Sequence, residues 1–215
     1  MKQSVLLIGM GKFGSYLCRR LYEQGCEIMV VDTNEEQLSG LLRYVVSTKI
    51  GDCRRKEVLE NFGIDAFDHC VVCIGEDFQS SLEITDNLHE LGAKHIISRA
   101  CTDTQAKFLL KNGAHEVVYP ERDLAERLAI SIGIDGVLDY FKLSQKGSIY
   151  EIAPPAAWVG RNLRELDVRK RFNVNIVAIN RVDGDISMPT PDYVFTRDEK
   201  ALAFASHDDI LKVFK

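Results

Sequence analysis

A short apolar run leads directly into a glycine-rich turn near the start of the chain, and this succession leaves few folds open. Residues 5–8 read Val-Leu-Leu-Ile, and glycines follow at positions 9, 11 and 14, where a stretch with helical spacing begins. A strand, a glycine turn and a helix in this order form the opening of a βαβ unit. The sequence therefore predicts a parallel sheet that has residues 5–8 as one of its strands.

The alternation of apolar runs with helical stretches continues to about residue 119. Further apolar runs lie at 28–31, 45–46, 70–74, 95–97 and 117–119, and helical patterns lie at 12–24, 79–91 and 103–111. Ser80 or Ser81 and Asp103 are the expected N-caps of the last two helices. Nearly continuous β-branched runs are typical of strands buried on both faces. We therefore predict an α/β fold with a doubly wound, Rossmann-type parallel sheet.

The composition and the order of the expected elements change near residue 120. All six cysteines precede residue 102, whereas all five prolines follow residue 119. Beyond that point the expected elements are helices at 121–132, 162–172 and 208–214, strands at 148–152, 175–180 and 200–205, and a hairpin turn at 183–184. We expect a nucleotide-type sheet over 1–120, a helix and linker over 121–147, and a small α+β lobe over 148–215.

Composition limits the cellular compartments and the classes of partner that are expected for this chain. The 27 basic and 32 acidic residues give a net charge of -5, which argues against a general nucleic-acid or anionic-membrane surface. No apolar run approaches the roughly 18 residues that a membrane helix needs, and residues 1–11 are too short and glycine-broken for a signal peptide. We expect a reduced, cytoplasmic compartment without disulfides, and any membrane role to be peripheral or through a partner.

The Cys70-x-x-Cys73 pair lies inside one apolar run. On a strand, positions three apart point to opposite faces of the sheet. The two thiols therefore cannot hold one metal ion or form a redox pair there, and we predict that both are buried core residues.

The glycine turn points to phosphate binding. Gly9 permits the tight turn, Gly11 lets a pyrophosphate approach the backbone, and Gly14 lets the helix pack closely on the strand. Exposed N–H groups and the helix dipole then hold the phosphates. Asp32 follows Gly14 by 18 residues, at the position where an acid binds ribose hydroxyls and disfavours the extra 2′-phosphate of NADP. The alternative is a structural turn that binds nothing.

Other residues at the carboxyl ends of the strands can complete a pocket, since open α/β sheets bind ligands there. Asp52 can accept a hydrogen bond from adenine or ribose, or alternatively cap the helix that follows. Lys12 and Arg99 can bring positive charge to phosphates, or alternatively be solvated surface charges. Two basic groups favour ATP or ADP as much as NAD, so the glycine turn does not indicate which of these nucleotides binds.

The sequence shows no recognisable catalytic motif beside the glycine turn. A nicotinamide dehydrogenase needs a general acid or base beside the hydride site, and the histidines form no recognisable catalytic motif. A Walker lysine motif and a winged-helix recognition segment are also missing from the sequence. We therefore predict a nucleotide sensor and no enzyme, with a small NAD(H)-dependent Rossmann oxidoreductase as the alternative.

The sequence resembles the RCK family (regulators of K⁺ conductance, the TrkA-type or KTN domains), and within it the KtrA-like regulators of potassium transporters. The matching stretches are 5–14, 30–32, 51–52, 119–123, 158–166 and 174–179. The resemblance implies a Rossmann-type lobe that binds ATP, ADP or NAD(H), a crossover helix near 121–132, and a TrkA-C-like lobe that makes a second dimer contact. It also implies dimers assembled into an octameric ring on the cytoplasmic face of a separate K⁺-translocating membrane subunit, gated by nucleotide exchange.

The resemblance also implies which individual residues contact the nucleotide. The expected nucleotide contacts are Gly9, Met10, Gly11, Lys12, Phe13, Gly14, Asp32, Thr33, Asp52, Cys53, Ile74, Gly75, Glu76 and Arg99. Lys12 stands where relatives place an arginine that reaches the γ-phosphate, and a lysine there pairs only as a point charge.

Two further ligands are implied by the same resemblance. Glu121 matches a position that binds a divalent cation, Mg²⁺ or Ca²⁺, between dimer partners, although an acid in a first helical turn also suits the helix dipole. Arg169 and Asn175 match positions that bind cyclic di-AMP at the dimer interface. The basic stretch 161–171 is equally compatible with a plain solvated helix.

Overall fold

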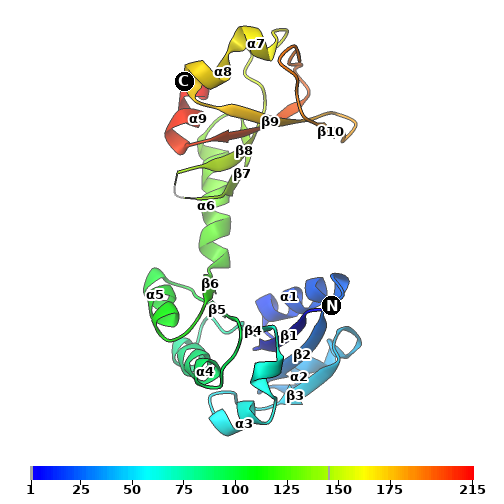
Figure 1. Cartoon of the computed structure of the whole chain (residues 1–215), viewed down its shortest axis with the longest axis vertical. Coiled ribbons are helices and arrows are strands. Elements are labelled where there is room, and N and C mark those ends of the chain that lie inside the picture. Colours follow the sequence, from blue (N-terminus) through cyan, green and yellow to red (C-terminus); the bar gives the residue numbers. More distant parts are fainter. Residues whose placement is uncertain (1, 145) are drawn as a thin grey trace. The chain divides into compact units, whose positions relative to one another are not determined.

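The computed structural model describes residues 2–144 and 146–215. Its contacts divide the chain into two compact units, one ending at Arg122 and the other beginning at Asp123 (Figure 1). Helix α6 (Pro120–Gly133) begins in the first unit and continues into the second. The division predicted from the sequence, at residues 120 and 147, stays a prediction, and each unit is described here by itself.

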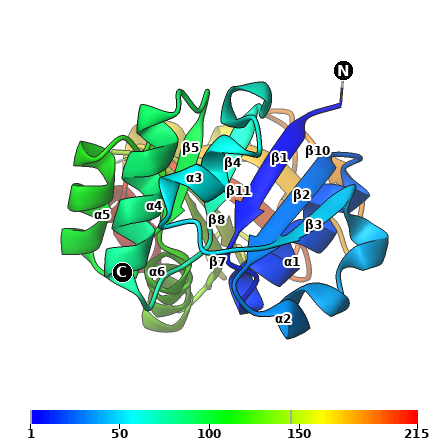
Figure 2. The same ribbon diagram turned by 90° about the horizontal axis from the view of Figure 1, so that it is seen from below.

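The first unit is built on a parallel sheet. Its strands are β1 (Ser4–Ile8), β2 (Glu27–Asp32), β3 (Ser47–Ile50), β4 (His69–Val72), β5 (Ile96–Arg99) and β6 (Glu116–Val118). They are ordered β3-β2-β1-β4-β5-β6, and all their pairings are parallel (Figure 2). This is the order of a doubly wound dinucleotide-type sheet, so the predicted fold class is confirmed.

Helices cover both faces of this sheet. The elements that join the strands are α1 (Lys12–Glu23), α2 (Glu35–Ser39), η1 (Leu42–Tyr44), α3 (Lys56–Glu60), η2 (Ile64–Ala66), α4 (Phe78–Glu90) and α5 (Asp103–Lys111). One face packs on α1, α2 and η1 and the other on α3, α4 and α5, as the two core clusters show. Cys70 belongs to one cluster and Cys73 to the other, as predicted from the alternation of a strand.

Three local predictions in this unit need correction. Helix α4 is capped by Asp77, and Ser80 is the residue whose N–H the cap receives; α5 is capped by Thr102 in place of Asp103. In both helices the chosen cap is the polar residue that precedes the first helical turn. The run at 45–46 lies just before strand β3, which is polar and at the sheet edge, so hydrophobicity did not mark it.

The second unit contains an antiparallel sheet. Its strands are β7 (Val137–Lys142), β8 (Ser148–Ile152), β9 (Asn175–Asn180), β10 (Ile186–Ser187) and β11 (Lys200–Ala205), in the order β10-β9-β11-β8-β7. Its core includes Tyr150, Trp158 and Phe195. Strand β7, inside the segment expected to be a helix and linker, pairs with β8 and extends this sheet.

The helices of the second unit are α7 (Leu163–Leu166), α8 (Val168–Phe172) and α9 (His207–Phe214). The single helix predicted over 162–172 is therefore two short helices. Asp167, with φ of 44°, adopts the left-handed conformation that ends α7 and starts α8. Asn162 is the N-cap of α7, because its side chain accepts a hydrogen bond from the N–H of Glu165 (2.8 Å).

Candidate functional site

The turn between β1 and α1 requires glycine at two positions. Gly9 has φ of +90°, and a Cβ there would lie 2.6 Å from Cγ1 of Ile74. A Cβ at Gly14 would lie 2.3 Å from the carbonyl oxygen of Gly9, so α1 lies directly against the strand end. A Cβ at Gly11, in contrast, would meet nothing within 4 Å. The backbone at Gly11 is therefore open to a ligand, as the pyrophosphate prediction requires.

Asp32 is fixed beside this turn. Its carboxylate accepts a hydrogen bond from the N–H of Met10 (2.6 Å) through Oδ2 and one from the N–H of Asn34 (2.8 Å) through Oδ1. These bonds hold the acid at the carboxyl end of β2, next to the end of β1, with lone pairs remaining on both oxygens. The arrangement fits an acceptor for ribose hydroxyls.

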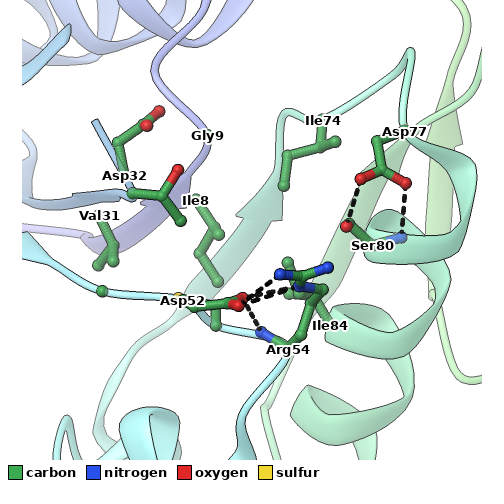
Figure 3. Close-up of a pocket in the computed structure, with 13 residues that line it drawn as sticks. Ile8, Gly9, Val31, Asp32, Asp52, Arg54, Ile74, Asp77, Ser80 and Ile84 are labelled. Carbon is green, nitrogen blue, oxygen red and sulfur yellow. Dashed lines mark hydrogen bonds and ion pairs between the residues drawn. The ribbon is translucent and has the colours of Figure 1, made fainter.

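A pocket of about 310 Å³ opens at the carboxyl ends of the strands (Figure 3). The residues that line it and were predicted from the sequence are Gly9, Asp32, Thr33, Asp52, Cys53 and Ile74. The lining also includes Ile8, Val31, Gly51, Arg54, Asp77, Ser80 and Ile84. The structure therefore brings the ends of β1 and β2 together with the segment after β3 and the start of α4.

The remaining predicted nucleotide residues lie outside this lining. They are Met10, Gly11, Lys12, Phe13, Gly14, Gly75, Glu76 and Arg99. Met10 and Gly14 are buried beneath the turn, whereas Gly11, Lys12 and Glu76 are exposed. Lys12 is the first residue of α1, so it stands where the helix dipole also favours an anion.

Arg99 lies beside the glycine turn. Its guanidinium carbon is 5.6 Å from the centre of the Phe13 ring, and a Cβ at Gly75 would approach that carbon to 3.0 Å. The Nε of Arg99 is buried and, among the described residues, has no hydrogen-bond partner. An unsatisfied buried donor costs free energy, and a phosphate oxygen on the turn is a suitable acceptor for it.

Glu121 forms an ion pair with Arg99 from the first turn of α6. This partner was not foreseen, because the two residues are 22 positions apart in the sequence. Within the described residues, no group of three or more His, Cys, Asp and Glu side chains is arranged to hold a metal ion. The divalent cation at Glu121 was expected between two copies of the chain and stays a prediction.

Asp52 has two roles in the structure. It accepts from the N–H of Arg54 in the turn before α3, and it also lines the pocket. It does not cap α3, which the alternative interpretation expected, because the N-cap of that helix is Arg55 and no side chain caps it by a hydrogen bond among the described residues. Hydrogen bonds from the Arg54 side chain hold the pKa of Asp52 below its ordinary value. The neighbouring thiol behaves oppositely, since burial raises the pKa of Cys53 to about 12. Cys53 is therefore a neutral wall of the pocket and an unreactive thiol.

Arg169 and Asn175 come together in the second unit. Both line a pocket of about 330 Å³ that also includes Lys146, Asn173 and Asp209. Asn173 and Asp209 are joined there by a hydrogen bond of 2.8 Å. The two predicted residues thus share one concave surface, and cyclic di-AMP as its ligand stays a prediction.

Sequence reasoning missed Arg54, Asp77 and Ser80 in the pocket at the strand ends. Asp77 accepts from the N–H (3.1 Å) and the Oγ (2.6 Å) of Ser80, and the Ser80 hydroxyl lowers the pKa of Asp77. A positional signal was available for Arg54 and Asp77, which follow the ends of β3 and β4 within five residues. Ser80 lies inside α4, and the sequence had suggested it only as a helix cap.

Comparison with known proteins decides the family. Residues 5–120 match the TrkA-N domain and residues 148–215 match the TrkA-C domain. Over 215 residues the chain is 37% identical to Ktr system potassium uptake protein C of Bacillus subtilis (strain 168), which covers 100% of this chain and 97% of that protein. This chain belongs to the TrkA-type family of Ktr potassium uptake proteins. The resemblance predicted from the sequence is confirmed.

A second relative agrees with this TrkA-type assignment, and a solved structure shares the fold. Ktr system potassium uptake protein A of the same Bacillus strain is 31% identical over 210 residues, covering 97% of this chain and 94% of that protein. The structure of the GsuK channel bound to NAD shares the fold, with a TM-score of 0.70 at 16% identity over 99% of this chain. The chain spans 39% of the length of that structure.

A second solved structure is similar to part of the TrkA-type chain. It is the Kef CTD of Shewanella denitrificans in AMP-bound form, with a TM-score of 0.52 and 26% identity, covering 60% of this chain and 79% of that one. Among the described residues of this chain, no helix is both long and apolar enough to cross a membrane.

Proposed function

We propose that this TrkA-type chain is a cytoplasmic, nucleotide-sensing regulatory subunit that gates a separate membrane K⁺-translocating subunit. The observation that carries the proposal is the pairing of a glycine turn, open at Gly11 and flanked by the fixed acid Asp32, with similarity to Ktr proteins along the whole chain. The membrane subunit is the partner, and the inner face of the cell membrane is where the chain associates with it.

The proposed ligand is an adenine nucleotide: ATP or ADP, or NAD(H). The phosphates occupy the open turn near Lys12 and Arg99, and the ribose hydroxyls donate to Asp32. The AMP-bound form of the Kef CTD and the NAD-bound form of the GsuK channel support this class of ligand. The buried Nε of Arg99, which has no hydrogen-bond partner among residues 2–144 and 146–215, supports the placement of phosphate at the turn.

Arg99 gives the bound phosphate a route to α6. In the structure its guanidinium pairs with Glu121 in the first turn of that helix. A phosphate on the turn competes with Glu121 for the same cation. A ligand shifts a conformational equilibrium only by its difference in affinity for the two states, and the exchange of partners by Arg99 supplies such a difference.

Assembly into dimers and an octameric ring is part of the proposal. Helix α6 has no buried residue among those described, and Leu124, Leu128 and Ile132 along it are each more than half exposed. These leucine and isoleucine side chains, spaced four apart, form one apolar stripe. Such a stripe suits contact with a second copy of the chain. A divalent cation at Glu121 and cyclic di-AMP at Arg169 and Asn175 remain proposals beside it.

The role is proposed to be non-enzymatic. Relatives along the whole chain are named as potassium uptake proteins. The competing oxidoreductase function predicts steady oxidation of NADH with a carbonyl substrate. The regulatory function predicts saturable binding without turnover.

Titration of the purified full-length protein with ATP, ADP and NADH, by calorimetry, tests the function. We expect saturable binding of at least one of them, with the ligand recovered unchanged, and altered hydrogen exchange in α6. Glu121→Gln leaves Arg99 free for phosphate, so this variant is expected to bind the same nucleotide several-fold more tightly and to lose the response of α6. Absence of binding to all three nucleotides, or their turnover, contradicts the proposal.

A further inference from the structure

The pocket proposed to bind the nucleotide differs in charge from the glycine turn beside it. Asp32, Asp52 and Asp77 are in the lining, and Arg54 is the cation among the described lining residues (Figure 3). Three carboxylates against one guanidinium repel phosphate, whereas the turn has Lys12 and Arg99 beside it. The pocket therefore suits the uncharged parts of a nucleotide, its ribose and base.

The order of the strands sets the order of these parts. The glycine turn follows β1, Asp32 ends β2, and Asp52 comes shortly after β3, with β3-β2-β1 adjacent in the sheet. A nucleotide whose phosphates lie on the turn and whose ribose reaches Asp32 directs its base toward the segment after β3. Asp52 and Arg54 stand at that end of the pocket.

Asp52 is largely occupied by Arg54. Its Oδ1 accepts from Nε (2.9 Å) and from the backbone N–H (3.1 Å) of Arg54, and its Oδ2 accepts from Nη2 (2.6 Å). The carbonyl oxygen of Arg54 accepts in turn from Nδ2 of Asn87 on α4 (2.9 Å). Arg54 is therefore held in place both at its guanidinium and at its backbone carbonyl.

One end of this guanidinium is left available. Within the described part of the chain, Nη1 of Arg54 makes no hydrogen bond, and the side chain is 49% exposed. Ile8 and Ile84 line the same pocket and supply apolar surface. An anchored, planar guanidinium with an exposed face can stack on a base.

We propose that Arg54 binds the base of the nucleotide, held in position by Asp52, so that the two residues recognise the base as a unit. This inference rests on the proposed nucleotide function and deepens it. From the sequence, Asp52 was expected to accept from adenine or ribose or to cap a helix, and in the structure most of its acceptor capacity is taken by Arg54.

The test compares the affinities of AMP, ADP and ATP, because a base contact is common to all three. Arg54→Ala is expected to weaken binding of each by the same factor, about tenfold or more, the size of a base-stacking contact. Arg54→Lys is expected to lose as much, since an ammonium has no planar face. Both variants leave the carboxylate of Asp52 in place.

Arg55→Ala is the matched control. Arg55 is the next residue, is well exposed, lies outside the pocket lining, and only approaches Glu57 at 3.9 Å, so its removal is expected to leave all three affinities unchanged. A loss that grows from AMP to ATP places Arg54 on the phosphates and overturns the inference, as does unchanged or tighter binding by Arg54→Ala. NADH, which carries the same base, is titrated beside them, and if the wild-type protein binds none of the four, the proposed function itself fails. Thermal unfolding of each variant separates these results from misfolding.

Discussion

At the scale of single residues, the glycines of the turn meet two different requirements, one set by the fold and one set by the proposed ligand. Gly14 is needed by the fold, because a Cβ there would lie 2.3 Å from the Gly9 oxygen and 3.2 Å from Cβ of Cys73. The fold does not require Gly11, because a Cβ there would meet nothing within 4 Å, so only the proposed ligand would need a glycine at this position. The two substitutions to alanine are therefore expected to have opposite signatures.

Gly14→Ala is expected to destabilise the protein, since overpacking costs about 1–3 kcal/mol and exceeds the gain in helix propensity of up to about 1 kcal/mol. Gly11→Ala, at the N-cap of α1, is expected to cost less than about 1 kcal/mol but to weaken nucleotide binding at least tenfold. Urea unfolding and nucleotide titration of both variants measure this. Equal stability losses in the two variants contradict the assignment.

Residues whose role follows from backbone geometry were predictable, and those that depend on distant partners were not. Gly9, Gly14 and the opposite faces of Cys70 and Cys73 follow from local rules that the sequence displays. The pairing of Arg99 with Glu121 depends on β5 and α6 meeting in space. No periodicity in the sequence carries that information.

At the scale of elements, the last helix is tied to α8 through one carboxylate. Asp209, in the first turn of α9, accepts from Nζ of Lys212 (2.6 Å), Oγ of Ser206 (2.7 Å) and Nδ2 of Asn173 (2.8 Å). Asn173 is the C-cap of α8. These bonds, that from Lys212 first, lower the pKa of Asp209 to about 2.

This lowered pKa predicts a pH window. The folded protein keeps Asp209 ionised below the ordinary aspartate pKa near 4, so the stabilisation is complete above about pH 4 and is lost as the pH falls toward 2. Asp209→Asn is expected to lower the Tm at pH 6, and the difference from wild type is expected to shrink between about pH 4 and 2. Asp208→Asn, which removes a charge from the same turn without these bonds, is the control. A Tm difference that stays constant across the window contradicts the prediction.

Element boundaries show where sequence patterns stop being informative. The strands of the parallel sheet are apolar because both faces are covered, so most of them were found. Strand β3 was misplaced because it lies at the sheet edge and reads Ser-Thr-Lys-Ile. The break between α7 and α8 depends on the left-handed conformation of Asp167, which helical spacing on either side conceals.

At the scale of the whole molecule, the proposed nucleotide pocket and the proposed assembly surface are formed by different parts of the chain. All described lining residues of the nucleotide pocket lie between Ile8 and Ile84, whereas the exposed apolar stripe lies on α6. The sequence predicted two units with different folds but did not predict β7 as a strand of the second sheet, because its apolar stretch at 137–143 carried no clear alternation.

This separation predicts that assembly can be broken while binding is kept. Leu128→Glu places a charge in the middle of the α6 stripe and is expected to reduce the oligomer, measured by analytical ultracentrifugation, while nucleotide affinity changes less than twofold. Leu110→Glu on α5 is the matched control, because Leu110 is 51% exposed and Leu128 is 52% exposed, so the two variants introduce the same change at equal exposure. If both variants dissociate the oligomer, the effect reflects added charge in general. If Leu128→Glu assembles like wild type, α6 is not the contact, because a buried, unpaired carboxylate in an interface is too costly to be accommodated without loss of affinity.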